Sequence, residues 1–112
     1  MPASSYYKPE HLQHFGEIRK GQKELGDKFF DYYGSVFKQG ALSEREKALI
    51  ALAVSHALRC PYCIDAYTQN SLEKGADLEQ MTEAVHVATA IAAGSTLVYG
   101  MQMQEQVAKK VM

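Results

Sequence analysis

The chain has 112 residues, with 12 Lys and Arg against 13 Asp and Glu, and a formal net charge of −1 at pH 7. We expect one domain spanning residues 1–112, because a chain of this length builds a single core. Nucleic acid is not an expected partner, since proteins that bind it usually carry a clustered excess of basic residues. The apolar fraction of 46% is ordinary for a globular protein.

Neither a targeting signal nor a membrane span is expected. Residues 1–8, MPASSYYK, show no basic stretch that leads into an apolar run. The least polar stretch, residues 84–100, is interrupted by polar side chains and is shorter than the roughly 20 apolar residues that cross a bilayer. We therefore expect a cytoplasmic protein. Thiols in that reducing compartment are seldom structural disulfides, so the two cysteines are candidates for redox chemistry or metal binding.

Apolar residues recur at helical spacing, and no segment shows the alternation typical of strands, so we predict an all-α protein of about six helices. The predicted helices cover approximately residues 9–21, 25–40, 43–60, 61–74, 77–94 and 96–110. Glycines are placed to end the first, second and fourth of these helices. Gly94 with Ser95 marks either a break before the last helix or a close helix contact. The second helix has an apolar stripe that we expect to face a core.

The third predicted helix begins at a capping box formed by Ser43 and Glu46, and Asp77 with Gln80 begins the fifth in the same way. The third helix is apolar on nearly every face, so we expect it to be buried on all sides. The fifth is expected to bury the apolar residues Met81, Ala84, Val85, Ala88, Ile91 and Ala92.

The run Cys60-Pro61-Tyr62-Cys63 carries the chemistry of this sequence. Pro61 disfavours helix in the residue before it and suits the first position of a new helix, which makes Cys60 the N-cap and places Cys63 in the first turn. Free backbone N–H groups and the helix dipole favour thiolates there and lower the thiol pKa. One cysteine can then attack a substrate while the other resolves the product as a disulfide. The dipole argument favours Cys60 as the nucleophile.

Two other interpretations of the pair remain open. A structural zinc site needs four ligands, so this pair would have to borrow from His56, His86 or a second subunit. Alternatively, both cysteines pack as small hydrophobic side chains. We expect neither a bound metal nor a cofactor.

A dithiol peroxidase or a disulfide reductase needs such a pair of cysteines. Reduction of a peroxide also needs a base that takes the thiol proton and an acid that protonates the leaving oxygen. His56 lies four residues before Cys60, on the same helix face, and is a candidate catalytic residue. It could instead be satisfied by a backbone carbonyl or line a subunit contact. Tyr67, one turn beyond Cys63, could donate a hydrogen bond to a thiolate or peroxide, or simply pack. Asp65 is expected on the exposed side of its helix.

The run from residue 42 to residue 75, LSEREKALIALAVSHALRCPYCIDAYTQNSLEKG, resembles the AhpD-like alkylhydroperoxidase and carboxymuconolactone decarboxylase superfamily, and the similarity extends through MTEAVHVATAIAAG. From YYKPEHLQHFGEI onward, the chain looks like small peroxidase-like proteins associated with arsenosugar biosynthesis. The resemblance implies one AhpD-like helical bundle that assembles as a homotrimer or homohexamer. It also implies that Cys63 is the peroxidatic nucleophile, which becomes a sulfenic acid, and that Cys60 resolves it.

The sequence departs from that family in its proton relay. The family's peroxidases carry a glutamate in the buried helix and a histidine four residues after the second cysteine, where this chain has Ala48 and Tyr67. We therefore expect weak activity or an unusual substrate.

The function that the resemblance implies is a thiol-dependent peroxidase-like oxidoreductase. Its substrate is a small-molecule hydroperoxide or disulfide, and a thiol reductant regenerates it. The alternative is a non-enzymatic dithiol module that captures a soft ligand such as trivalent arsenic or a metal ion. A decarboxylase is the weakest candidate, because decarboxylases of this superfamily generally lack the redox pair.

Overall fold

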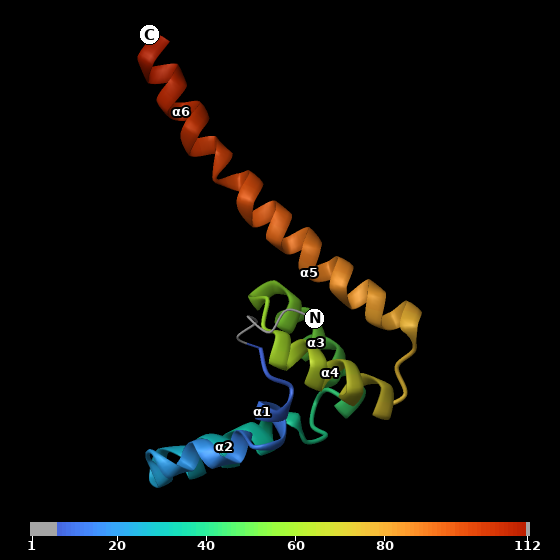
Figure 1. Cartoon of the computed structure of the whole chain (residues 1–112). Helices are drawn as coiled ribbons and strands as arrows, with labels where there is room; N and C mark the ends of the chain where they lie inside the picture. The colour runs from blue at the N-terminus through green and yellow to red at the C-terminus, as the bar shows by residue number, and fades with distance from the viewer. Residues whose placement is uncertain (1–6, 112) are drawn as a thin grey trace.

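The computed structural model describes residues 7–111, and all the regular elements in that range are helical, which confirms the all-α prediction. The elements in chain order are α1 (Glu10–Gln13), the short 3₁₀ helix η1 (Phe15–Lys20), α2 (Lys23–Phe37), α3 (Glu44–Leu58), α4 (Pro61–Glu73), α5 (Leu78–Val98) and α6 (Gly100–Val111). Figure 1 shows α3 and α4 side by side, and the first part of α5 packs against α3.

The small core lies where α3, α4 and the start of α5 meet. Leu52 of α3, Ala76 of the loop and Met81 of α5 are buried together. Leu49 and Tyr67 pack against this cluster and are only partly buried. Tyr67 lies one turn after Cys63 on α4, so the core holds the helix that carries the cysteines.

Capping sets where α3 and α5 begin, as the sequence predicted. The Ser43 hydroxyl accepts from the Glu46 N–H at 3.0 Å, and the Glu46 carboxylate accepts from the Ser43 N–H at 2.7 Å. Asp77 and Gln80 form the same pair of bonds at the start of α5. The third helix ends at Leu58 instead of Cys60, because the next residue adopts a left-handed conformation with a φ of 55°.

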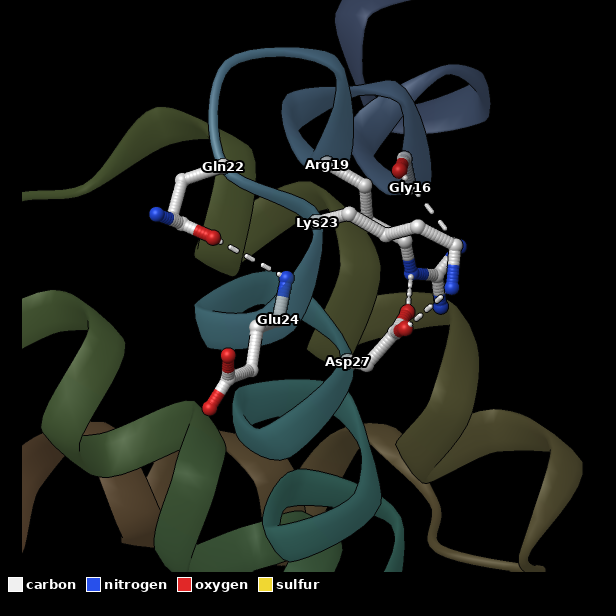
Figure 2. Close-up of polar contacts among 6 residues, drawn as sticks. All are labelled: Gly16, Arg19, Gln22, Lys23, Glu24 and Asp27. Atoms are coloured by element: carbon white, nitrogen blue, oxygen red, sulfur yellow. Dashed lines mark hydrogen bonds and ion pairs between the residues drawn. The ribbon is translucent and has the colours of Figure 1, made fainter.

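Charged side chains join η1 to α2 at a tight corner (Figure 2). The Asp27 carboxylate forms an ion pair with the Arg19 guanidinium at 2.9 Å and accepts a hydrogen bond from the Lys23 ammonium at 2.7 Å. The Gln22 side chain accepts from the Glu24 N–H at 3.1 Å and so caps α2. The corner folds η1 back onto α2.

Two helix limits in this half differ from the prediction. The first predicted helix is two elements, α1 and η1, because His14 between them leaves helical geometry with φ −111° and ψ 15°. The second ends at Phe37 and not at Gly40, since Lys38 is extended. The Lys47 ammonium donates to the last carbonyls of α2 and so replaces a glycine cap.

Helices α5 and α6 form a long arm that leaves the body of the molecule (Figure 1). A break at Gly94 and Ser95 is wrong, because α5 continues to Val98 and the interruption falls at Tyr99. The alternative, a close helix contact at Gly94, is not found among the described residues, since nothing lies within 4 Å of a Cβ placed there. The radius of gyration is 19.0 Å. A compact chain of this length has about 13 Å. Beyond the first part of α5, which packs against α3, nearly all of the arm is exposed in the single chain.

The arm also changes what was expected about membranes. Within Leu78–Val111, an 18-residue window has a mean hydropathy of 1.4 and no buried residue, so length and composition alone would let it cross a bilayer. The expectation that no stretch meets this condition is wrong. The observation is weak evidence for a span, because the core helices of soluble proteins meet the same condition.

Burial is lower than the sequence predicted. On α3, Ala48, Leu52 and Ser55 are buried, while Ile50 and Val54 are half exposed, so α3 is not buried on all sides. Of the six apolar α5 residues expected in the core, only Met81 is buried, and the stripe of α2 is also largely exposed. Helix α3 and the first part of α5 therefore each cover one face against the chain and leave another face bare.

Candidate dithiol site

Cys60 is the N-cap of α4, Pro61 is its first residue, and Cys63 lies in its first turn, as the sequence predicted. The Cys60 Sγ accepts a hydrogen bond from the Cys63 N–H at 3.2 Å. The two Sγ atoms lie 2.6 Å apart, and both are free, half-buried thiols. Because the first helical turn holds the sulfurs in contact, a disulfide between them needs little movement of the chain.

The pKa of Cys63 is raised, whereas the helix-dipole argument predicts that it is lowered. Burial, followed by the hydrogen bond and the charge of Cys60, raises the pKa of Cys63 to about 11 from 9.0. A hydrogen bond from the backbone of Cys63 itself lowers this pKa, but its effect is smaller. The dipole argument overlooked that two thiols in one partly buried site oppose each other's ionisation. Cys63 is therefore a thiol at neutral pH and needs help to lose its proton.

An apolar cavity of about 730 Å³ lies beside the pair. Side chains from the N-terminal segment, η1, α2 and α4 line it: His11, Leu12, His14, Phe15, Ile18, Phe30, Tyr33, Cys60, Tyr62, Cys63, Ala66 and Tyr67. A second apolar hollow of about 480 Å³ lies between α2 and α3. Cys63, Tyr33 and Tyr67 line both cavities, so these three side chains form the wall between them.

Tyr33 and Tyr67 meet at this wall, and their hydroxyls are hydrogen-bonded to each other. Phe37, one turn after Tyr33 on α2, stacks on the Tyr67 ring with centroids 5.2 Å apart. Burial raises the pKa of Tyr33, and negative charge on Cys63 or Cys60 raises it further. Tyr67 was a predicted candidate. Tyr33 was missed, because on sequence it belongs to the apolar stripe of α2.

The structure does not bring His56 to the cavities. Its Nδ1 contacts the Leu52 carbonyl oxygen at 2.8 Å, which is the backbone contact considered as the alternative role. Among the described residues, it does not line either cavity with the cysteines. Ala48 is fully buried in α3 and supplies no acid or base. His86 is exposed on α5.

The N-terminal segment covers the start of α4. Tyr62, between the cysteines, has its hydroxyl 2.9 Å from the His11 Nδ1 and 3.3 Å from the Lys8 N–H that donates to it. Tyr7 packs edge-on to the Tyr62 ring and donates to Asp65 at 2.5 Å, a contact that raises the pKa of Tyr7 to about 12. The prediction of an exposed Asp65 is therefore wrong, because this segment partly covers it.

Residues 23–106 match the model of the carboxymuconolactone decarboxylase family. The chain belongs to this family. It is 39% identical over 80 residues to uncharacterized protein 4 in the cox locus of Paracoccus denitrificans, a match that covers 71% of this chain and 72% of that protein.

Two solved structures share the fold of the present chain. A protein from Methanobacterium thermoautotrophicum has a TM-score of 0.73 and 32% identity, covering 77% of this chain and 97% of its own. A carboxymuconolactone decarboxylase family protein from Legionella pneumophila has a TM-score of 0.67 and 29% identity, covering 81% and 86%. These matches confirm the AhpD-like helical fold. The narrower likeness to arsenosugar-associated proteins stays a prediction.

The carboxymuconolactone decarboxylase family includes decarboxylases and alkylhydroperoxidases, so an enzyme is consistent with membership. Within residues 7–111, no group of three or more His, Cys, Asp or Glu side chains is placed to hold a metal ion. What distinguishes the site chemically is a pair of adjacent thiols and a pair of hydrogen-bonded tyrosines that line the same apolar cavity.

Proposed function

We propose that the protein is a thiol-dependent, peroxidase-like oxidoreductase that reduces a small-molecule hydroperoxide or disulfide. The observation that carries this proposal is the 2.6 Å contact between the Cys60 and Cys63 sulfurs at the start of α4. Two thiols in contact can pass from dithiol to disulfide and back with little movement of the fold, which is what a dithiol oxidoreductase needs at each turnover.

Cys63 is the proposed nucleophile, because it lines both cavities by which a substrate can approach, whereas Cys60 lines only one. The Cys63 thiolate attacks the terminal oxygen of the hydroperoxide. The S–O bond forms as the O–O bond breaks, so the sulfur becomes a sulfenic acid and the substrate becomes an alcohol. Cys60 then displaces water from that sulfur to form the disulfide, which a dithiol reductant reduces by exchange.

The cavity beside the cysteines supports a substrate with an apolar body. Its walls are mainly aliphatic and aromatic, and ring contacts between Phe15, Phe29 and Phe30 brace one side of it. A volume of about 730 Å³ accepts a small organic molecule.

The test is consumption of cumene hydroperoxide with dithiothreitol as reductant, followed for the wild type, Cys63→Ser and Cys60→Ser. We expect the wild type to turn over and to show a Cys60–Cys63 disulfide by mass spectrometry. Cys63→Ser should be inactive, and Cys60→Ser should stop at a sulfenic acid that dimedone traps. Turnover retained by both variants would sink the proposal.

A dithiol module that captures a soft ligand remains the alternative, since the same two sulfurs suit trivalent arsenic. The discriminating measurement is a thiol titration after incubation with arsenite. Stoichiometric loss of both thiols, together with background peroxide turnover, would favour the binding module over the enzyme.

We also propose that the protein works as a homo-oligomer, a homotrimer or homohexamer, in the cytoplasm. The support for assembly is the α5–α6 arm, whose large apolar side chains lie bare in the single chain. The support for the cytoplasm is chemical, because free thiols persist in a reducing compartment.

A further inference from the structure

We propose that Tyr33 is a catalytic residue of the dithiol site, with its hydroxyl, held by that of Tyr67, protonating the oxygen that leaves when the O–O bond of a hydroperoxide breaks. This inference rests on the proposed peroxidase function and adds a residue that the family motif does not contain. It also supplies a proton donor, which Ala48, at the position of the family's glutamate, cannot be.

The hydroxyl–hydroxyl hydrogen bond between Tyr33 and Tyr67 links α2 to the helix that carries the dithiol. Tyr67 follows Cys63 by one turn of α4, and its hydroxyl is hydrogen-bonded to that of Tyr33 from α2. Cys63 lines the same two cavities as both tyrosines. A hydroperoxide in contact with the Cys63 sulfur therefore lies in a space that both phenol groups border.

The electrostatics agree with a role as a proton donor. Tyr33 is partly buried, and this burial raises the pKa of its hydroxyl. Negative charge on Cys63 or Cys60 raises that pKa further. A tyrosine with a raised pKa stays protonated at neutral pH, so it donates hydrogen bonds and is not itself a resting base. It is therefore ready to protonate a strongly basic alkoxide.

The proposed step balances through the two phenols. The Cys63 thiol proton passes to the Tyr67 oxygen as the sulfur attacks the peroxide. Tyr67 passes its own proton to Tyr33, and Tyr33 passes its proton to the leaving oxygen. The sulfur becomes a sulfenic acid and the peroxide becomes an alcohol. The proton lost by the thiol equals the proton gained by the leaving oxygen, so water need not supply one. Both tyrosines return to the neutral form, and the raised pKa of Cys63 explains why its proton must be removed during the attack.

The experiment compares wild type, Tyr33→Phe, Tyr67→Phe and Tyr32→Phe in a single oxidation of the reduced protein. Tyr32 is the matched control, because it neighbours Tyr33 on α2 and is 68% exposed. The oxidants are tert-butyl hydroperoxide, whose alkoxide needs a proton, and peracetic acid, whose acetate does not. A small aromatic disulfide, 5,5′-dithiobis(2-nitrobenzoate), probes the thiols without any O–O bond.

We expect Tyr33→Phe to lose on the order of 100-fold in rate with tert-butyl hydroperoxide, but to react like the wild type with peracetic acid and the disulfide. Tyr67→Phe should show the same selective loss, and Tyr32→Phe none. Equal rates for Tyr33→Phe and the wild type, or an equal loss with all three reagents, would overturn the inference. A wild type that reacts with the disulfide but with neither peroxide would overturn the proposed peroxidase function itself.

Discussion

The Tyr62 hydroxyl lies 2.9 Å from the His11 Nδ1, so one of the two residues between the cysteines holds the N-terminal segment against the start of α4. The Tyr62 and His11 rings are also stacked, with centroids 5.9 Å apart. His11 lines the apolar cavity together with Cys60 and Cys63. The contact therefore sets how far the cavity beside the sulfurs is closed.

Removal of the Tyr62 hydroxyl should open the cover over the cysteines. Tyr62→Phe keeps the ring but loses the hydrogen bonds to His11 and Lys8, each worth about 1 kcal/mol. We expect the cysteines to react about tenfold faster with 5,5′-dithiobis(2-nitrobenzoate), measured by stopped-flow absorbance. Tyr99→Phe, an exposed position between α5 and α6, is the control. Equal rates in all three proteins would contradict this role of the contact.

The reactivity of Cys63 should rise steadily with pH. Burial and Cys60 raise its pKa to about 11, so its thiolate fraction increases about tenfold per pH unit from neutrality upward. The measurement is the rate of iodoacetamide labelling at Cys63, resolved from Cys60 by peptide mass spectrometry. In Cys60→Ser, the pKa of Cys63 should move back toward 9.0, because the neighbouring thiol no longer opposes its ionisation. A labelling rate at Cys63 that is already constant below pH 8 would contradict the raised pKa.

Helix caps were predictable from the sequence, because they depend on residues within one helical turn. Contacts between residues far apart in the sequence were not predictable, and neither was which apolar faces stay exposed in the single chain. The caps at Ser43, Asp77 and Cys60 follow from side chains that reach their own first turn. Tyr33 was not identified as a site residue, because nothing in α2 signals that it meets Tyr67. The bare face of Ile50 was also unpredictable, since apolar periodicity tells which face seeks cover and not which chain covers it.

Lys47 should be important for the placement of α2. Its ammonium donates to the carbonyl oxygens of Val36 at 2.7 Å and Lys38 at 2.6 Å, where the negative end of the helix dipole adds to the attraction. Lys47→Met keeps the aliphatic stem and removes these bonds, so we expect the free energy of unfolding to fall by about 1 to 2 kcal/mol.

Urea denaturation followed by circular dichroism, at one fixed protein concentration, measures this change. Lys38→Met is the matched control, because it removes the ammonium of an exposed lysine at the same end of α2. A Lys47→Met midpoint equal to that of Lys38→Met would show that α2 is held by its aromatic contacts alone.

Assembly should depend on the apolar stripe of the arm. Val87, Ile91 and Val98 lie on one face of α5 by their spacing and are 61%, 71% and 57% exposed in the single chain. Exposed apolar surface of this extent is typical of protein interfaces, so we expect native mass spectrometry to show a trimer or hexamer. Ile91→Asp places a charge that the interface cannot solvate and should shift the population to smaller species.

His86→Asp is the matched control for this shift, because it adds the same charge to α5 at an exposed position that is already polar. Circular dichroism of each variant shows whether the helices remain formed. A monomeric wild type at micromolar concentration would contradict the proposed assembly. An Ile91→Asp protein with the same subunit number as the wild type would instead place the contact on another face, because a buried aspartate at a packed apolar interface costs several kcal/mol per copy.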